Sequence, residues 1–309
     1  MKSVKTIPQI TFLFIAVVSV FFYSSCASGK SDFDSIISEF SSRLENDVQT
    51  DDVGSIAFGI FQDGDVVHSN AFGIIDRDTS EPARPDHIYR TGSISKSITA
   101  VLMMMLAQDG LLNIDDPVSK FLPEIENIQN TRGNIPDITL SQLASHTSGL
   151  IREPNLEDAA SGPIESWEDK VLASITKTRF QADPGDEYSY SNIGYGILGL
   201  ALSRAAGVPF MDLVEERIFQ TLGMNSSTFV LDDRLQPRLA SGYDYENGVI
   251  DGTVPLLEHA GRGYKVPNGG VYSTIDDLAN FSRIMTGEEF HLLSEDQRKS
   301  MMLIKTPES

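Results

Sequence analysis

Two serine–lysine pairs in this chain of 309 residues have a spacing that nucleophilic catalysis can use. Both follow the pattern Ser-x-x-Lys, one from Ser93 to Lys96 and the other from Ser174 to Lys177. On a helix this spacing places the hydroxyl and the ammonium one turn apart on the same face. A neutral lysine there could take the serine proton, and a helix N-terminus favours the negative charge that develops. The pattern alone is weak, because about one chance match is expected in 300 residues.

The sequence around the two pairs separates them. Ser93 follows Gly92 and opens residues 93–109, which are apolar nearly all round and end at Gly110. This pattern predicts a helix buried in the middle of the fold. Ser174 instead lies within an ordinary amphipathic segment, where an exposed surface pair is the better interpretation. We therefore expect Ser93 and Lys96 to be the functional pair.

A second motif, Tyr-x-Asn, also occurs twice. Tyr190 and Asn192 follow Pro184-Gly185 and precede a predicted helix that begins near Ile193. By themselves they are explained more simply as a half-buried tyrosine and an asparagine that caps this helix. The other copy, residues 245–247, runs into Gly248 and predicts a turn.

Composition excludes several classes of protein. The chain has 24 Lys+Arg against 44 Asp+Glu, a formal net charge of −20, so it would repel nucleic acid. Its single cysteine excludes both a disulfide framework and a cysteine-based zinc site. Its five histidines are scattered without the spacing of metal ligands, so we expect no metal. Residues 194–199 spell Gly-x-Gly-x-x-Gly, but they lie in a helical pattern with no preceding strand. Close helix packing explains them better than a dinucleotide site, and we expect no cofactor.

The N-terminus has the pattern of an export signal. Two lysines precede an apolar run at residues 10–23, which is short for a membrane span but suits a signal sequence. Cys26 follows two serines, and this resembles a bacterial lipoprotein signal whose cysteine is lipidated and becomes the mature N-terminus. An ordinary cleaved signal with an incidental cysteine is the alternative. We divide the chain into a signal (1–25), a tether (26–34) and a folded domain (35–309), exported and anchored to a bacterial membrane by lipid.

The remaining patterns predict mostly helices. Residues 31–47 have apolar residues at helical spacing, which predicts a first helix. Residues 54–62 and 65–73 have the pattern of two strands on either side of Asp63-Gly64, and they predict the one clear β-hairpin. Shorter helices are predicted at residues 115–122, 140–145, 166–178, 192–206, 210–222, 275–285 and 294–302.

Five segments, taken in order, resemble the serine β-lactamase and penicillin-binding protein superfamily, in its branch of class C β-lactamases, DD-peptidases and related esterases. They lie at residues 89–97, 143–150, 184–195, 222–224 and 269–278. The resemblance implies an α+β fold, an antiparallel sheet flanked by helices plus a helical lobe, with the active site between them. It also implies that Ser93 is the acylated nucleophile and that Lys96 activates it. Tyr190 would pass a proton to the leaving group, and Asn192 would hold a substrate amide.

The sequence departs from this superfamily at its third motif, Lys or His followed by a small residue and Gly on a late strand. His259-Ala260-Gly261 comes before the expected place, and Lys305-Thr306-Pro307 has proline where glycine is needed. We therefore expect the C-terminal strands to be missing and the domain to be incomplete. One hairpin cannot bury the apolar helix at residues 93–109, so we expect apolar side chains of this helix to be exposed to solvent. We therefore expect poor solubility and an inactive chain unless further strands are supplied.

Two functions remain open. The first is a serine hydrolase that forms an acyl-enzyme on D-Ala-D-Ala-type peptides, β-lactams or small esters and amides. The alternative is a catalytically inactive truncated remnant, or a ligand-binding module of the same fold. Either protein would take a small-molecule or peptide ligand and would contact the membrane through its N-terminal lipid.

Overall fold

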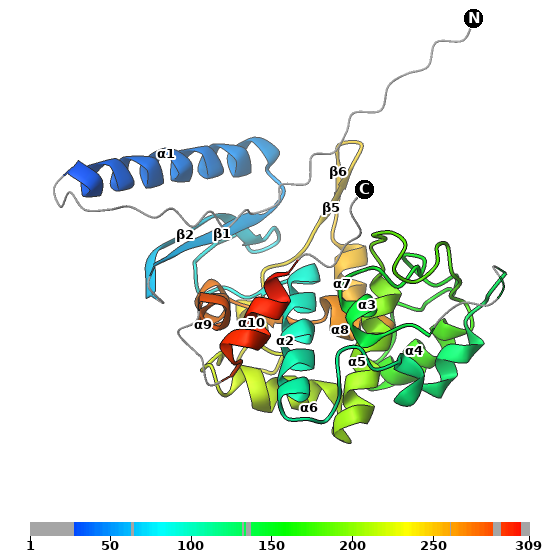
Figure 1. The fold of residues 1–309 in the computed structure, drawn as a ribbon. Coiled ribbons are helices and arrows are strands. Elements are labelled where there is room, and N and C mark those ends of the chain that lie inside the picture. Colours follow the sequence, from blue (N-terminus) through cyan, green and yellow to red (C-terminus); the bar gives the residue numbers. More distant parts are fainter. Residues whose placement is uncertain are drawn as a thin grey trace, which may run out of the picture. The chain divides into compact units, whose positions relative to one another are not determined.

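The computed structural model describes residues 28–62, 65–131, 133, 137–259, 261–286 and 292–303. The chain divides into two units after Arg43. The described part of the first unit is most of helix α1 (Ser28–Asp51), which confirms the helix predicted at residues 31–47. The second unit begins at Leu44 and contains all the other described elements (Figure 1). Cys26 and the predicted signal lie outside the described residues.

The predicted hairpin is present in the second unit. Strand β1 (Ser55–Gln62) pairs antiparallel with β2 (Asp65–Asp76), and Ser55 lies opposite Gly73. The short strand β3 (Glu81–Pro82) pairs with the far edge of β2, so that the sheet has the order β1-β2-β3. The turn residues Asp63 and Gly64 lie outside the described part of the chain.

Two further strand pairs show that the expectation of a single hairpin is wrong. Strand β5 (Asp244–Glu246) pairs with β6 (Val249–Asp251) around Asn247 and Gly248, whose φ values of 53° and 83° suit a tight hairpin turn. The turn predicted there is therefore confirmed. Strands β4 (Tyr89–Arg90) and β7 (Tyr272–Ser273) also pair antiparallel. Strands of two or three residues carry no periodic pattern that a sequence could reveal.

The rest of the second unit is mainly helical. Its α-helices are α2 (Ser95–Gln108), α3 (Leu140–Ala144), α4 (Trp167–Ile175), α5 (Asn192–Ala206), α6 (Phe210–Val214), α7 (Thr253–His259), α8 (Val266–Gly269), α9 (Ile275–Thr286) and α10 (Glu295–Met302). Single 3₁₀ turns lie at Gly92–Ile94, Val118–Lys120, Pro123–Asn127, Ile164–Ser166, Gln236–Arg238 and Gly263–Lys265.

Three predicted helices differ from the observed ones. The helix predicted at residues 115–122 is only the 3₁₀ turn Val118–Lys120. The helix predicted at residues 210–222 leaves α-geometry after Val214 and continues as a π-turn at Glu215–Phe219. The buried helix begins at Ser95 instead of Ser93, because a 3₁₀ turn precedes it.

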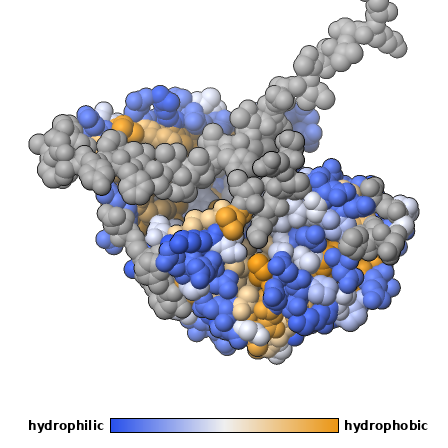
Figure 2. Space-filling view, viewed as in Figure 1, coloured by the Kyte–Doolittle hydropathy of each residue, from blue (hydrophilic) through white to orange (hydrophobic). Residues whose placement is uncertain are grey.

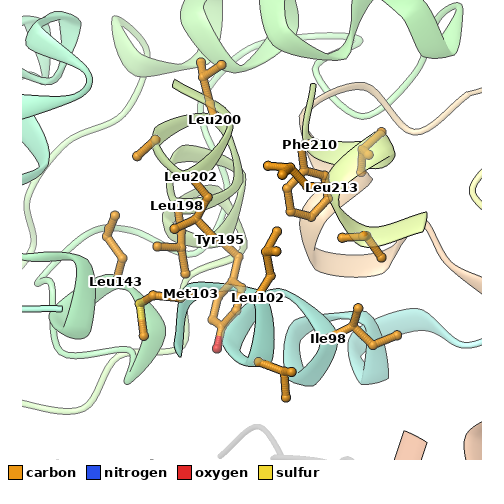
Figure 3. Packing of buried hydrophobic residues seen from close by; sticks show 14 of the residues in the cluster. Ile98, Leu102, Met103, Leu143, Tyr195, Leu198, Leu200, Leu202, Phe210 and Leu213 are labelled. Atoms are coloured by element: carbon orange, nitrogen blue, oxygen red, sulfur yellow. The ribbon is translucent and has the colours of Figure 1, made fainter. Parts of the chain in front are cut away.

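Helix α2 is buried by other helices. Its side chains at Leu102 and Leu106 are fully buried, and it packs against α5, α6, α8 and α10. Figure 3 shows Leu102 beside Tyr195 of α5, within the same apolar cluster as Phe210 of α6. We expected that only the hairpin could cover this helix and that its apolar side chains would otherwise be exposed to solvent. That expectation is wrong. The helical part of the unit supplies the covering surface.

The glycines of α5 allow a close contact with the segment that follows α7. A Cβ atom at Gly196 would lie 2.8 Å from the carbonyl oxygen of Tyr264, and one at Gly199 would overlap the ring of Pro267. The Gly-x-Gly-x-x-Gly sequence thus serves helix packing, as predicted.

Hydrophilic side chains predominate on the described surface in Figure 2, with smaller hydrophobic patches among them. Within the described residues no single helix has the length and hydropathy of a membrane span. The pair α5 and Phe210–Phe219 meets the criterion only when the two are taken together, and it is bent by 81°.

Candidate active site

Ser93 lies in the 3₁₀ turn between strand β4 and helix α2, and its side chain is exposed. Gly92 permits this abrupt turn because its φ is 54°. Thr91 fixes the turn, since its backbone N–H and its hydroxyl both donate to the carbonyl of Val271, each at 2.9 Å. The β4–β7 pair therefore determines where the Ser93 hydroxyl lies.

Lys96 comes one turn later and is buried, with 6% of its surface exposed. Its Nζ donates to Ser93 Oγ at 3.1 Å and to the carbonyl of Asn268 at 3.0 Å. The ammonium also lies over the ring of Tyr190, 4.9 Å from its centre. The serine–lysine geometry predicted for residues 93 and 96 is thus present, although Ser93 is in a 3₁₀ turn.

The surroundings of Lys96 favour its neutral form. Burial is the largest cause, and it lowers the pKa of Lys96 from its ordinary value to about 7. The positive charges of Arg152 and Lys265 lower this pKa further, whereas the negative charge of Glu153 raises it. At neutral pH a substantial fraction of Lys96 is therefore uncharged, and its lone pair can accept the proton of Ser93.

Tyr190 completes a three-residue cluster. Its hydroxyl lies 2.8 Å from Ser93 Oγ, where either oxygen can donate. The Tyr190 ring packs on the imidazole of His146, with the two ring centres 4.3 Å apart. The guanidinium of Arg152 lies 5.1 Å from the centre of the Tyr190 ring. The hydroxyl is thus placed to relay a proton to or from Ser93.

Asn192 lies at the first position of α5 and is not the helix cap that was predicted. The cap is Ser191, whose hydroxyl accepts from the backbone N–H of Gly194 at 3.0 Å. The side chain of Asn192 is almost fully buried, and its Nδ2 donates to Glu153 Oε1 at 2.6 Å. The backbone carbonyl of Asn192 accepts from Asn268 Nδ2 at 2.8 Å.

His146, one of the five histidines of the sequence, is buried inside the site. Its Nδ1 accepts from the backbone N–H of Ser191 at 3.1 Å, so the imidazole supports the segment that carries Tyr190 and Asn192. Burial, assisted by the charge of Lys96, lowers the pKa of His146 to about 4. The ring is therefore neutral at physiological pH.

Replacing Gly149 by alanine should destabilise the fold more than replacing Gly207. Both glycines have positive φ, 71° and 66°, so each substitution costs about 1–2 kcal/mol of backbone strain. Only at Gly149 would the new Cβ also overlap a backbone atom, the carbonyl oxygen of Ala182, whereas at Gly207 no heavy atom lies within 4 Å. Urea unfolding of both variants measures the difference, and equal losses would contradict this interpretation.

Two residues of the site were missed by the sequence analysis. Asn268 supplies the carbonyl that accepts from Lys96, and Glu153 binds the side chain of Asn192. Asn268 lies directly before Gly269, the start of one of the quoted segments, which is a weak signal. Glu153 belongs to no motif, and only the folded chain brings it to Asn192.

The alternative candidates lie elsewhere or outside the described residues. Ser174 is buried while Lys177 is exposed beyond the end of α4, so the expectation of an exposed surface pair is wrong. His259 Nδ1 lies 2.7 Å from the hydroxyl of Tyr272, and Ala260 and Lys305 are not described. Among the described residues, no group of three or more His, Cys, Asp or Glu side chains could hold a metal ion.

The Beta-lactamase family profile matches residues 40–306 of this chain. Protein flp of Staphylococcus aureus (strain MW2) is 26% identical over 260 residues, which cover 84% of this chain and 49% of that protein. D-alanyl-D-alanine-carboxypeptidase/endopeptidase AmpH of Escherichia coli (strain K12) is 29% identical over 221 residues, covering 71% and 54% respectively. The chain thus spans about half the length of the curated relatives it matches.

A solved structure shows the same fold. The octameric penicillin-binding protein homologue from Pyrococcus abyssi superposes with a TM-score of 0.72 and 26% sequence identity. The match covers 86% of this chain and 60% of the chain from Pyrococcus abyssi. The α+β architecture predicted from the sequence is confirmed by this likeness.

Proposed function

Because this chain belongs to the beta-lactamase family, we propose that it is a serine hydrolase that works through an acyl-enzyme on Ser93. One observation carries the proposal: Ser93 Oγ lies 3.1 Å from Lys96 Nζ and 2.8 Å from the hydroxyl of Tyr190. A hydroxyl nucleophile thereby has a base and a proton relay within hydrogen-bond distance, which is the arrangement that acyl transfer requires.

Acylation uses each of these groups in turn. Neutral Lys96 accepts the Ser93 proton as Oγ bonds to the substrate carbonyl carbon. Tyr190 delivers its own proton to the leaving amine or alcohol, and Lys96 then passes the proton it took from Ser93 to Tyr190. The bond from the carbonyl carbon to the leaving group breaks, and an ester to Ser93 remains. Water then attacks that ester and gives a proton to the same relay. The relay returns a proton to Ser93 Oγ as the ester bond breaks, and the acid is released. Ser93 is regenerated without any change of oxidation state.

The start of the helical segment stabilises the charge that develops on the carbonyl oxygen. Ser93 lies in the first turn, Gly92–Ile94, which continues directly into α2. Backbone N–H groups in a first turn have no acceptor within their own helix, and the helix dipole is positive there. The Ser93 N–H is therefore suited to be a donor to the developing oxyanion.

The substrate class that we propose is peptides ending in D-alanyl-D-alanine, with β-lactams and small esters as alternatives. The proposal draws on the similarity to the E. coli carboxypeptidase/endopeptidase. It is also supported by charge, since Arg152 and Lys265 both act electrostatically on Lys96 and would attract the terminal carboxylate of such a peptide. A neutral ester lacks this carboxylate.

Labelling with a fluorescent penicillin and with a fluorophosphonate tests the proposed function. We expect both probes to modify the protein covalently, with the modified peptide containing Ser93. Release of D-alanine from a diacetyl-Lys-D-Ala-D-Ala peptide tests the substrate class. Circular dichroism of the same sample shows whether it is folded. A folded protein that neither probe labels would favour the non-catalytic alternative.

We further propose that the protein acts outside the cytoplasm, attached to a bacterial membrane by lipid on Cys26. The proposal rests on the position of Cys26 directly after the apolar run and two serines. Replacing Cys26 by serine should abolish labelling by radioactive palmitate and should release the protein from the membrane fraction. Mass spectrometry that finds an unmodified Cys26, or a different mature N-terminus, would contradict it.

A further inference from the structure

Glu153 lies at the edge of the cluster, in a loop that is tied to the start of α5. The carbonyl of Arg152 accepts from the backbone N–H of Asn192 at 2.9 Å, and the carbonyl of Ile151 accepts from the hydroxyl of Ser191 at 2.8 Å. These bonds fix the loop at residues 151 and 152, directly before Glu153. The side chain of Glu153 is therefore held against the site although 40% of it is exposed.

The carboxylate of Glu153 has three polar neighbours. Its Oε1 accepts from Asn192 Nδ2 at 2.6 Å, and the same oxygen lies 3.7 Å from Arg152 Nε. Its Oε2 lies 3.6 Å from Lys265 Nζ. The hydrogen bond to Asn192 is thus the shortest contact, and the two cations lie at longer ion-pair distances.

Lys96 experiences charges from several elements at once. The hydroxyl of Ser93, in the 3₁₀ turn before α2, contacts its ammonium. The rings of Tyr190, just before α5, and Tyr195, in α5, also face the ammonium. Asn268 of α8 contributes a carbonyl, and His146 is neutral. The charged groups that act on it are Arg152, Lys265, Arg262 and Glu153.

The charged groups that act on Lys96 are three cations and one carboxylate. Three cations disfavour the charged form of Lys96, and Glu153 opposes them. Arg262 is in turn paired with Glu258, with Nη1 and Oε1 2.7 Å apart. Arg152 and Lys265 are the two cations that lie next to Glu153 itself.

We propose that Glu153 is a positioning residue of the active site: it orients the amide of Asn192 and supplies the negative charge that balances the cations around Lys96. The inference rests on the proposed function, because it concerns the base and the substrate-binding amide of that reaction. Glu153 acts through Asn192 and Lys96 and does not itself contact Ser93 in any hydrogen bond that the described residues make.

The variants Glu153→Gln and Glu153→Ala separate the two roles. Glutamine keeps an oxygen that can accept from Asn192 Nδ2, so only the charge is lost. Lys96 should then become neutral at a lower pH. Alanine removes the charge and also the acceptor, which leaves the Asn192 amide unpositioned. Its expected additional effect is a higher KM for a peptide substrate whose amide that side chain would hold.

The experiment measures the rate of labelling by an uncharged fluorophosphonate over about pH 5–9, a range that extends on both sides of the pKa of Lys96. For the wild-type chain the rate should rise with pH through about 7, as neutral Lys96 forms. We call this rise of the rate with pH the acid limb. For Glu153→Gln the midpoint of the acid limb should move to lower pH by ~0.2–0.7 pH, the size expected for a partly exposed charge pair. Glu153→Ala should show the same movement together with a roughly tenfold higher KM for D-alanyl-D-alanine peptides.

Glu295→Gln is the matched control. Glu295 also pairs with a lysine, Lys299, at 2.6 Å, but on α10 and with both side chains exposed. Its replacement should leave the acid limb in place. An acid limb unchanged in Glu153→Gln, moved to higher pH, or moved equally in Glu295→Gln would overturn the inference. A folded wild-type chain that the probe does not label would instead overturn the proposed function.

Discussion

Ser93→Ala should remove covalent labelling by penicillin and by fluorophosphonate, and should lower turnover by a factor on the order of 10⁴–10⁶. The reason is that alanine removes the oxygen that lies within hydrogen-bond distance of both Lys96 and Tyr190. Because Ser93 is exposed, we expect little change in stability: the free energy of unfolding of the variant should lie within about 0.5 kcal/mol of the wild-type value. Probe labelling followed by peptide mapping measures the first effect, and urea unfolding measures the second.

The control for this prediction is Ser174→Ala in the other Ser-x-x-Lys sequence. Ser174 is buried, and its hydroxyl has no hydrogen-bond partner among the described residues, so its removal should not affect labelling. Equal labelling of the wild-type chain and Ser93→Ala would refute the assignment of the nucleophile.

Tyr190→Phe should lower turnover by about 10²–10⁴ while leaving the fold intact. The substitution removes the hydroxyl 2.8 Å from Ser93 Oγ but keeps the ring that packs on His146, 4.3 Å away between ring centres. The relay to the leaving group is then lost, so an amide substrate should be affected more than an activated ester, whose leaving group needs little protonation. Steady-state rates with both kinds of substrate measure the difference.

Tyr188→Phe is a suitable comparison for this variant. Tyr188 also contacts His146, edge-on with the ring centres 5.8 Å apart, but it is 54% exposed. Its hydroxyl should be dispensable. If Tyr190→Phe turned over substrate as fast as Tyr188→Phe does, Tyr190 would be a packing residue only.

The elements with strong local signals were predicted from the sequence. The helix at residues 192–206 has the predicted bounds, because Ser191 caps its start and Gly207, with a φ of 66°, ends it. The hairpin β1–β2 follows from alternation around a turn. In both cases the sequence carries a local signal, a helix cap and terminating glycine in the first and alternating residues around a turn in the second, so both elements could be predicted.

Elements that depend on distant contacts were not predicted. Strands β4 and β7 are two residues each, and they form only because segments some 180 residues apart pair, with Tyr89 opposite Ser273. The cover of helix α2 was also misjudged, since its apolar pattern shows that it is buried but does not show by what. The helices α5, α6, α8 and α10 that cover it are brought there by the tertiary fold.

The candidate site divides in the same way. The sequence by itself predicted the candidate groups: Ser93 and Lys96 from their spacing at the start of an apolar helix, and Tyr190 and Asn192 from the resemblance of the ordered segments to a known family. Only the tertiary structure decided that the Tyr190 hydroxyl reaches Ser93, that Lys96 is buried enough to be partly neutral near pH 7, and that Glu153 holds Asn192. Side-chain type is a local property of the chain, whereas distance, burial and electrostatic balance are produced by residues far apart in sequence that the fold brings together.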